Sequence, residues 1–221
     1  MEAAKYNIMG SDYIGVFATA TDDFLFAGAG LTGNSKEMMA KVLGVRCIDL
    51  KVSGSDLIGL FARANSNGII ISNLAIDNEV SGLKNAGLDI NVCVLESSLN
   101  AVGSNILAND RMAIVNPDYS EKECVEIGDA LDVEVIRAQV DGFKTVGANS
   151  ILTNRGLVMN NKSTAKEKSD WDRISGFDST ITTANTGALA IGLATIANSN
   201  GLVVGDTTTG YELARILDAL E

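Results

Sequence analysis

The chain of 221 residues contains no histidine. This absence removes the usual general base near neutral pH, the Ser-His-Asp and Cys-His nucleophile systems, and histidine-ligated zinc. A carboxylate or lysine could still act as a base, but no convergent pair stands out. The acidic groups that do lie close together in sequence fit solvated helix or turn surface better: they are Glu167, Asp170 and Asp172, and the pair Asp22 and Asp23. We therefore expect no catalytic residues, no cofactor, no metal and no enzyme activity.

Cysteine and long apolar runs are also scarce. Three cysteines, an odd number, argue against a disulfide framework, and buried reduced thiols are the simpler interpretation of Cys47, Cys93 and Cys124. The chain has neither a run of about 18 apolar residues nor a basic segment followed by a short apolar one. We expect a cytoplasmic protein with a single domain, residues 1–221, and no membrane partner.

What the sequence does contain is an internal repeat. An aliphatic residue followed by glycine recurs five times, and the glycines follow one another at intervals of 44, 44, 44 and 45 residues. They are Gly15, Gly59, Gly103, Gly147 and Gly192. A fixed period in this range is typical of stacked or ringed supersecondary units. We interpret these glycines as structural, because they permit close backbone packing or a positive φ near the centre of a ring.

A helix start recurs at a fixed distance after the glycine. Four units have a glutamate 20 residues after it, and the first has one two residues later. In four units a good helix cap stands three residues before the glutamate, which is the capping-box pattern. The caps are Asn34, Ser120, Thr164 and Thr209, and the glutamates are Glu37, Glu79, Glu123, Glu167 and Glu212. The second unit has Ile76 at this place, where Asp77 could serve instead. Residues 205–210 resemble a phosphate loop but lack its lysine, so we interpret them as a helix start.

Strand-like segments flank each predicted helix. Two apolar runs split by a polar turn precede it, with turns at residues 65–68, 109–111, 154–156 and 198–201. Another strand-like run follows it, at residues 45–48, 90–94, 133–136 and 179–182. The predicted unit is therefore strand, turn, strand, helix, strand.

The two ends of the chain complete each other. Thirty residues run from Gly192 to Glu221 and fourteen precede Gly15, which together make one period of 44. The strand missing from the last unit is supplied by the amino end, where residues 6–9 look strand-like. The sequence thus predicts an α+β fold, a closed five-fold ring with repeats 13–56, 57–100, 101–144, 145–189 and 190–221 plus 1–12. Closure leaves few free sheet edges, so we expect a monomer.

These features resemble one known family. The five-unit ring, the Gly-x-x-x-x-x-Asn hairpin signature and residues 198–213 (Asn-Ser-Asn-Gly-Leu-Val-Val-Gly-Asp-Thr-Thr-Thr-Gly-Tyr-Glu-Leu) resemble the translation initiation factor 6 family, and residues 102–110 resemble its third repeat. The resemblance runs from Ile14 to Leu220 with the repeat phase preserved. It implies the five-fold αβ propeller called the pentein. Because the chain ends at Glu221, without the carboxyl extension of eukaryotic members, it also implies an archaeal member.

The resemblance implies a ribosome anti-association factor. Members bind the intersubunit face of the large ribosomal subunit, where they contact a basic ribosomal protein next to the sarcin-ricin loop and block joining of the small subunit. In eukaryotes they also accompany maturation of that subunit. The net charge of −11 repels RNA phosphate and suits a basic protein partner. We therefore expect rRNA contact to be secondary, and no DNA partner.

The resemblance also implies contact residues. Those of the family lie just after the third repeat glycine, here Ser104 and Asn105, although the family usually has Asn directly after that glycine. The equivalent positions Val16 and Leu60, and the turn Ser66–Asn67, complete the predicted ribosome-binding set. From the residues alone, left-handed turn geometry is the structural interpretation of the hairpin asparagines.

Two other functions remain open. Some penteins are guanidino-modifying enzymes, deiminases and amidinotransferases, which use a Cys-His pair with carboxylates; this chain offers no histidine for such a pair. The other alternative is a repeat scaffold that binds a non-ribosomal protein through the same rim of the ring.

Overall fold

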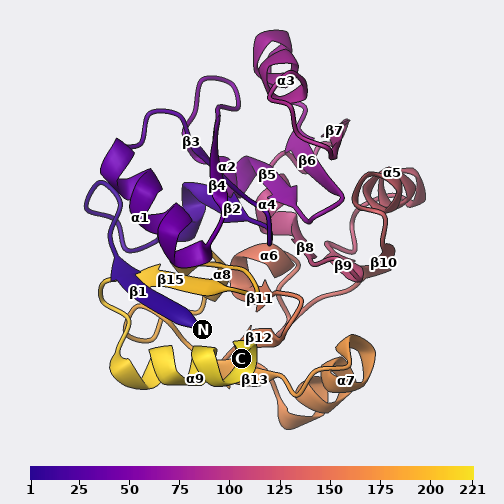
Figure 1. The fold of residues 1–221 in the computed structure, drawn as a ribbon. Helices are drawn as coiled ribbons and strands as arrows, with labels where there is room; N and C mark the ends of the chain where they lie inside the picture. Colours follow the sequence, from indigo (N-terminus) through magenta and orange to yellow (C-terminus); the bar gives the residue numbers. More distant parts are fainter.

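The computed structural model describes all 221 residues, which form five three-stranded sheets around a common centre (Figure 1). The sheets are β2 (Ala18–Ala20), β3 (Phe24–Gly28) and β4 (Arg46–Leu50); β5 (Ala62–Ala64), β6 (Gly68–Ser72) and β7 (Asn91–Leu95); β8 (Ile106–Ala108), β9 (Met112–Val115) and β10 (Glu134–Arg137); β11 (Ser150–Leu152), β12 (Leu157–Asn160) and β13 (Thr180–Thr182); and β14 (Thr195–Ala197), β15 (Gly201–Gly205) and β1 (Glu2–Tyr6). Within each sheet the first two strands form an antiparallel hairpin and the third runs parallel to the second. The predicted order of elements in the unit is confirmed.

Two sets of helices belong to this ring. The longer ones lie at its periphery (Figure 1): α1 (Gly33–Leu43), α3 (Asp77–Lys84), α5 (Glu121–Leu131), α7 (Ala165–Ser175) and α9 (Gly210–Leu220). Short helical segments of three or four residues precede the innermost strands: η1 (Ile14–Val16), α2 (Ile58–Phe61), α4 (Val102–Asn105), α6 (Val146–Asn149) and α8 (Ile191–Ala194). The repeat glycines lie in these short segments, which the sequence pattern did not predict as helical.

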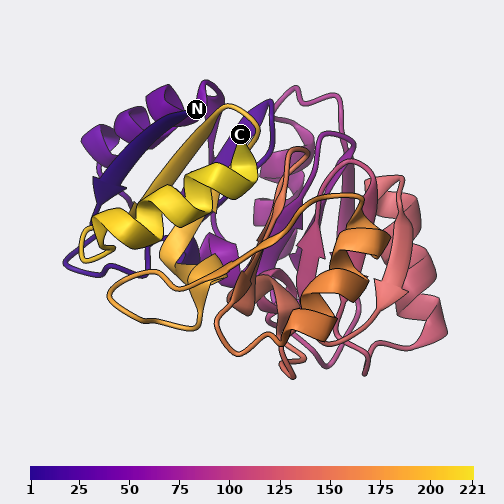
Figure 2. The same cartoon turned by 90° about the horizontal axis from the view of Figure 1, so that it is seen from below.

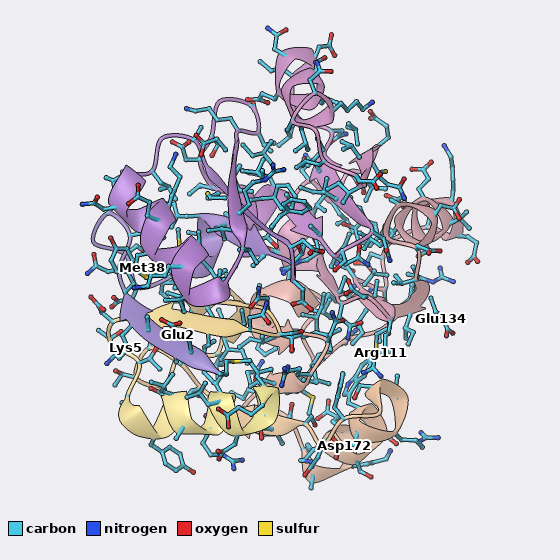
Figure 3. All side chains as sticks on the ribbon, in the orientation of Figure 1. Glu2, Lys5, Met38, Arg111, Glu134 and Asp172 are labelled. Atoms are coloured by element: carbon cyan, nitrogen blue, oxygen red, sulfur yellow. The ribbon has the colours of Figure 1, made fainter.

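The amino-terminal strand closes the ring, as predicted. β1 pairs in parallel with β15, from Glu2 opposite Gly201 to Tyr6 opposite Gly205. Figures 1 and 2 both show the indigo first strand beside the yellow last strand, and Figure 3 labels Glu2 and Lys5 of β1 near Met38 of α1. The predicted position of this strand, residues 6–9, was wrong. Residues 8–11 instead form a tight turn, in which Met9 has φ 54° and Gly10 has φ 80°.

The helix caps are as predicted in three units. Ser120, Thr164 and Thr209 each accept a hydrogen bond from the backbone N–H of the glutamate three residues on, and the carboxylate of that glutamate accepts one from the backbone N–H of the cap residue. Two predictions need correction. In the first unit the cap is Thr32, not Asn34, because the Thr32 hydroxyl accepts from the Ser35 N–H at 3.2 Å and the helix begins at Gly33.

In the second unit Ile76 keeps the cap position. Its N–H donates to the Glu79 carboxylate at 3.0 Å, but it has no side-chain oxygen to accept a bond in return. Asp77, which the sequence offered as an alternative cap, is the first residue inside the helix. This helix therefore has only half of a capping box, and with eight residues it is the shortest of the peripheral five.

The hydrophobic core is divided into five clusters, and each one joins two neighbouring repeats. Met39 of the first repeat packs with Ile196 and Val203 of the fifth. The remaining clusters join the first repeat to the second through Phe26 and Ile69, the second to the third through Ile70 and Ile127, the third to the fourth through Ile114 and Trp171, and the fourth to the fifth through Val158 and Ile216. Because burying one such side chain contributes about 1.5–3 kcal/mol, these shared clusters hold the repeats together. The predicted closed five-fold αβ propeller, the pentein arrangement, is confirmed.

Two smaller expectations concern the cysteines and the membrane. Cys124 is buried, Cys47 and Cys93 are partly buried, and all three are free thiols. None of the helices combines the length and the apolar character that crossing a bilayer would require.

Candidate interaction surface

The five repeat glycines pack on one another around the centre of the ring. A side chain on any of them would collide with the carbonyl oxygen of the glycine one repeat earlier. Thus Gly59 packs on Gly15, Gly103 on Gly59, Gly147 on Gly103, Gly192 on Gly147 and Gly15 on Gly192, which completes a circle. None of the five has a positive φ. Their structural interpretation is therefore confirmed, and its physical cause is close backbone approach rather than left-handed geometry.

The ring has two ends, separated by the short innermost strands. We call one the glycine end: it consists of η1, α2, α4, α6 and α8 together with the loops that precede them, residues 7–13, 51–57, 96–101, 138–145 and 183–190. We call the other the hairpin end: it consists of the turns at residues 21–23, 65–67, 109–111, 153–156 and 198–200. Each innermost strand has three residues and spans about 10 Å.

Asparagines hold the turns of the hairpin end together. The Asn65 side chain donates to the carbonyl of Asn109 at 3.1 Å, and Asn109 donates to that of Thr153 at 2.9 Å. Asn198 donates to Thr21 O at 2.9 Å in the same way. The same side chains accept from the N–H groups two and three residues on, which is an Asx turn. None of these asparagines has a positive φ, so the left-handed geometry that we expected for them was wrong.

Carboxylates complete this network. Asn154 donates to both Asp22, at 2.9 Å, and Asp110, at 2.6 Å. Asp22 also accepts from the N–H and hydroxyl of Ser199, and Asp110 from those of Ser66. Asp22 is therefore a partly buried structural group and not solvated turn surface, whereas its neighbour Asp23 is exposed. Most polar groups of the hairpin end are used inside the protein.

Glutamates tie the loops of the glycine end to the peripheral helices. The capping residue Glu79 also accepts from the N–H groups of Ser53 and Gly54, both at 2.8 Å. Glu212 likewise accepts from Gly187 N at 2.8 Å and from the Thr183 hydroxyl at 2.6 Å. Burial opposes ionisation of Glu212, but the hydrogen bonds from Thr183, Thr209 and Gly187 outweigh it and lower its pKa to about 2. The loops at residues 51–57 and 183–190 are thus held in place by charge-assisted hydrogen bonds.

The six predicted contact residues do not form one patch. Val16 in η1 and Leu60 in α2 lie partly exposed at the glycine end, whereas Ser66 and Asn67 lie at the hairpin end. The Asn67 side chain donates to Leu131 O at 3.1 Å. The structure therefore separates residues that the sequence grouped together, and their contact role stays a prediction.

The remaining two predicted residues lie in α4 and are buried. Ser104 is 8% exposed and Asn105 is 5% exposed. The Asn105 amide donates to Ala101 O at 2.9 Å, and its oxygen accepts from the Asn116 amide at 2.7 Å. Ser104 and Asn105 therefore lie beneath the surface of the glycine end and expose little surface area to a partner.

Two exposed apolar residues at the glycine end were not predicted from the sequence. Met9 is 82% exposed and Tyr13 is 42% exposed, and both lie in the loop before η1. The sequence does mark their loop, because a second series of glycines recurs in the equivalent loops of four repeats, and in the structure these glycines have positive φ. This series comprises Gly10, Gly54, Gly142 and Gly187.

The comparisons with known proteins agree on one family. Residues 3–219 match the family model described as the eIF-6 family. The chain belongs to this family. It is 36% identical over 225 residues to "Translation initiation factor 6" of Pyrococcus horikoshii, covering 100% of this chain and 99% of the relative. It is 38% identical over 214 residues to the protein of the same name from Methanosarcina acetivorans, covering 97% and 96%. The resemblance seen in the sequence is confirmed.

These matches identify this eIF-6 family member as a translation factor of the archaeal type. The protein of the same name from Saccharolobus islandicus is 33% identical over 221 residues, covering 100% of this chain and 99% of the relative. Among solved structures, a mutant of DDAH from Pseudomonas aeruginosa, complexed with citrulline, matches with a TM-score of 0.44 and 13% identity over 77% of this chain and 69% of that one. This likeness is too distant to bear on the activity of the eIF-6 family member.

Proposed function

We propose that this protein binds the large ribosomal subunit and blocks joining of the small subunit by occupying space between them. The observation that carries the proposal is the match to the eIF-6 family over residues 3–219, with relatives named translation initiation factor 6. The ring supports a steric mode of action, because its hydrogen-bonded ends and shared core clusters make it a rigid obstacle. No turnover and no cofactor belong to this mechanism. A role in maturation of the large subunit, a cytoplasmic location and a monomeric state are parts of the same proposal.

The glycine end is the better candidate for the ribosome contact. At the hairpin end, most polar groups are bonded within the protein, so they have little left to offer a partner. The glycine end instead presents Met9 and Tyr13, and exposed apolar and aromatic side chains of this kind are typical of interface centres. Val16 and Leu60 lie at the same end and are partly exposed. Loops held in place lose little conformational entropy on binding.

Charge supports a basic protein as the direct partner. The formal net charge is −11, and the loops of the glycine end carry more acidic than basic residues. The exposed or partly exposed acidic ones are Asp12, Asp56 and Glu96, and the basic ones are Lys51 and Lys144. Such a field attracts a basic ribosomal protein next to the sarcin-ricin loop and repels rRNA phosphate, which makes rRNA contact secondary.

Rejoining of purified archaeal subunits, followed by light scattering, tests this proposal. Added to large subunits before small ones, the protein should lower the scattering of joined ribosomes, and its effect should weaken as salt rises. In sucrose gradients it should sediment with free large subunits and be missing from joined ribosomes. Full rejoining at saturating protein, with no co-sedimentation, would contradict the proposal and favour a scaffold for a non-ribosomal partner.

The proposal also makes this family member a non-enzyme. The alternative, a guanidino-modifying activity, needs a nucleophile activated by a base, and this chain has no histidine to supply one. Incubation with arginine or agmatine should give no ureido product. Release of citrulline or carbamoyl-putrescine at a rate proportional to protein concentration would overturn this part of the proposal.

A further inference from the structure

A small cavity lies at the centre of the ring, just inside the circle of glycines. It has a volume of about 40 Å³ and is lined by Gly15, Gly147 and Gly192 together with residues of the innermost strands. By this measure about 10–15 Å³ is enough for one water molecule, so the cavity has room for a small ion together with water.

One cation lines this cavity. Arg63 occupies the position four residues after its repeat glycine, where the other repeats have Thr19, Leu107, Ile151 and Ile196. Its Nη2 donates to the carbonyl of Gly103 at 2.6 Å, which is the only hydrogen bond of the side chain. Its Nε is buried and has no partner. No carboxylate lies within ion-pairing distance of it, although this is a protein of net charge −11.

Two hydroxyl groups in the same cavity are also without partners. The Oγ1 of Thr19 and the Oγ of Ser150 are buried and make no hydrogen bond. The sequence brings them from the first and fourth repeats, so they meet only because the ring closes. Three unsatisfied polar groups, each able to donate, therefore line one cavity.

This arrangement is costly as it stands. A charge that lines an interior cavity is destabilising unless it is paired, and so is a buried donor without a partner. Arg63 remains charged near neutral pH, because burial lowers its pKa only to about 10. A water molecule could satisfy the hydroxyls but would leave the charge uncompensated.

We propose that the central cavity binds one small monovalent inorganic anion of the chloride class, with Arg63 Nε, Thr19 Oγ1 and Ser150 Oγ as its donors. The anion neutralises the Arg63 guanidinium and satisfies donors from three repeats at once. It acts as a structural ion that stabilises the centre of the ring. Metal cations are repelled by Arg63. This inference does not depend on ribosome binding.

Thermal unfolding of the full chain tests the proposal. The unfolding temperature is measured in sodium chloride and in sodium gluconate at equal ionic strength, because gluconate is too large for the cavity. Chloride should raise it by about 3–5 °C for each tenfold increase above the dissociation constant. Arg63→Met should remove this chloride dependence. Arg173→Met, whose side chain is 77% exposed on α7, should retain it.

A second variant covers the case in which Arg63→Met fails to fold. Thr19→Val with Ser150→Ala keeps the charge and removes two donors, so it should bind chloride at least tenfold more weakly. Crystals grown in sodium bromide should show an anomalous peak within hydrogen-bond distance of Arg63 Nε. The same unfolding temperature in chloride and gluconate, or a bromide crystal with only water in the cavity, would overturn the proposal. Chloride dependence that survives in Arg63→Met would overturn it as well.

Discussion

The α-ammonium group of Met1 lies 3.0 Å from Oε1 of Glu221, so the first and last residues of the chain form an ion pair. This contact places the two ends side by side, next to the pairing of β1 with β15. Because the two ends meet, the ring could be opened at another loop without changing the order of its repeats.

A circular permutant should therefore fold. We expect a chain in which a short glycine-serine linker joins Glu221 to Met1, with new ends at the exposed loop of residues 85–87, to unfold within a few degrees of the original protein. By contrast, deletion of residues 1–6 removes β1 and leaves the edge of β15 unpaired. The deletion variant should be strongly destabilised and prone to aggregation. Circular dichroism melts and size-exclusion chromatography measure both effects. A stable, monomeric deletion variant would contradict the role of β1.

The circle of glycines makes a second prediction. In Gly103→Ala the added methyl group would collide with backbone oxygens of Gly59 and Ala62, which cannot move aside as a side chain could. We expect a loss of about 1–3 kcal/mol or more in the free energy of unfolding, measured with urea. Gly82→Ala is the matched control: it lies inside α3 with open space around it, so it should stabilise by about 0.5–1 kcal/mol. Equal effects at the two sites would be inconsistent with glycine packing.

Glu212 should make stability fall in acid. Its folded pKa is about 2, below the ordinary value of 4.5, so it stabilises the fold fully above pH 4.5 and loses this contribution as the pH falls toward 2. The contribution is of the order of 2–3 kcal/mol. Urea unfolding gives the free energy of unfolding at pH 7 and at pH 3. The difference between these two values should be smaller for Glu212→Gln than for the original protein. The same difference in both proteins would show that the pKa of Glu212 is not lowered.

Asp141 should have the opposite effect. Burial raises its pKa to about 7, against the hydrogen bond from Asn160 N–H, so its ionisation costs stability as the pH rises from 3.8 toward 7. Asp141→Asn keeps an acceptor for that N–H and tolerates the positive φ of 60°. Relative to the original protein, we expect the free energy of unfolding of the variant to rise by roughly 2 kcal/mol more at pH 8 than at pH 5. A gain that is the same at both values would refute the raised pKa.

The ends of the ring make the last prediction. If the glycine end contacts the ribosome, Tyr13→Arg and Leu60→Arg should weaken anti-association at least tenfold, because each places a bulky positive charge against a basic partner. Asn67→Arg, at the hairpin end, should act like the original protein. Light scattering of rejoining subunits over a protein titration gives the three midpoints. If Asn67→Arg alone is impaired, the hairpin end is the contact surface.

The period of the repeat was enough to predict the ring, because a spacing of 44 residues leaves one unit to be completed by both ends. Local chemistry also predicted the caps at Ser120, Thr164 and Thr209. It failed where two local signals competed: Thr32 and Asn34 are both good caps, and the structure uses Thr32. The amino-terminal strand was predicted, but at residues 6–9 instead of 2–6, because a local pattern does not show which residues pair with β15.

The candidate sites were harder to predict than the fold. Nothing near Arg63 or Asp22 in sequence indicates that these residues face the centre of the ring. Their partners come from other repeats, such as Gly103 and Ser199. The sequence shows which positions are equivalent, but the closed structure is needed to show which side chains meet.

The shared core clusters have a consequence for how the molecule comes apart. In an open solenoid the outermost unit has one neighbour and can fray first. Here every unit has two, so loosening any one of them disrupts two clusters, and no unit is predisposed to open before the rest. Native-state hydrogen exchange should accordingly find the slowest amides of all five sheets exchanging together, through one concerted opening.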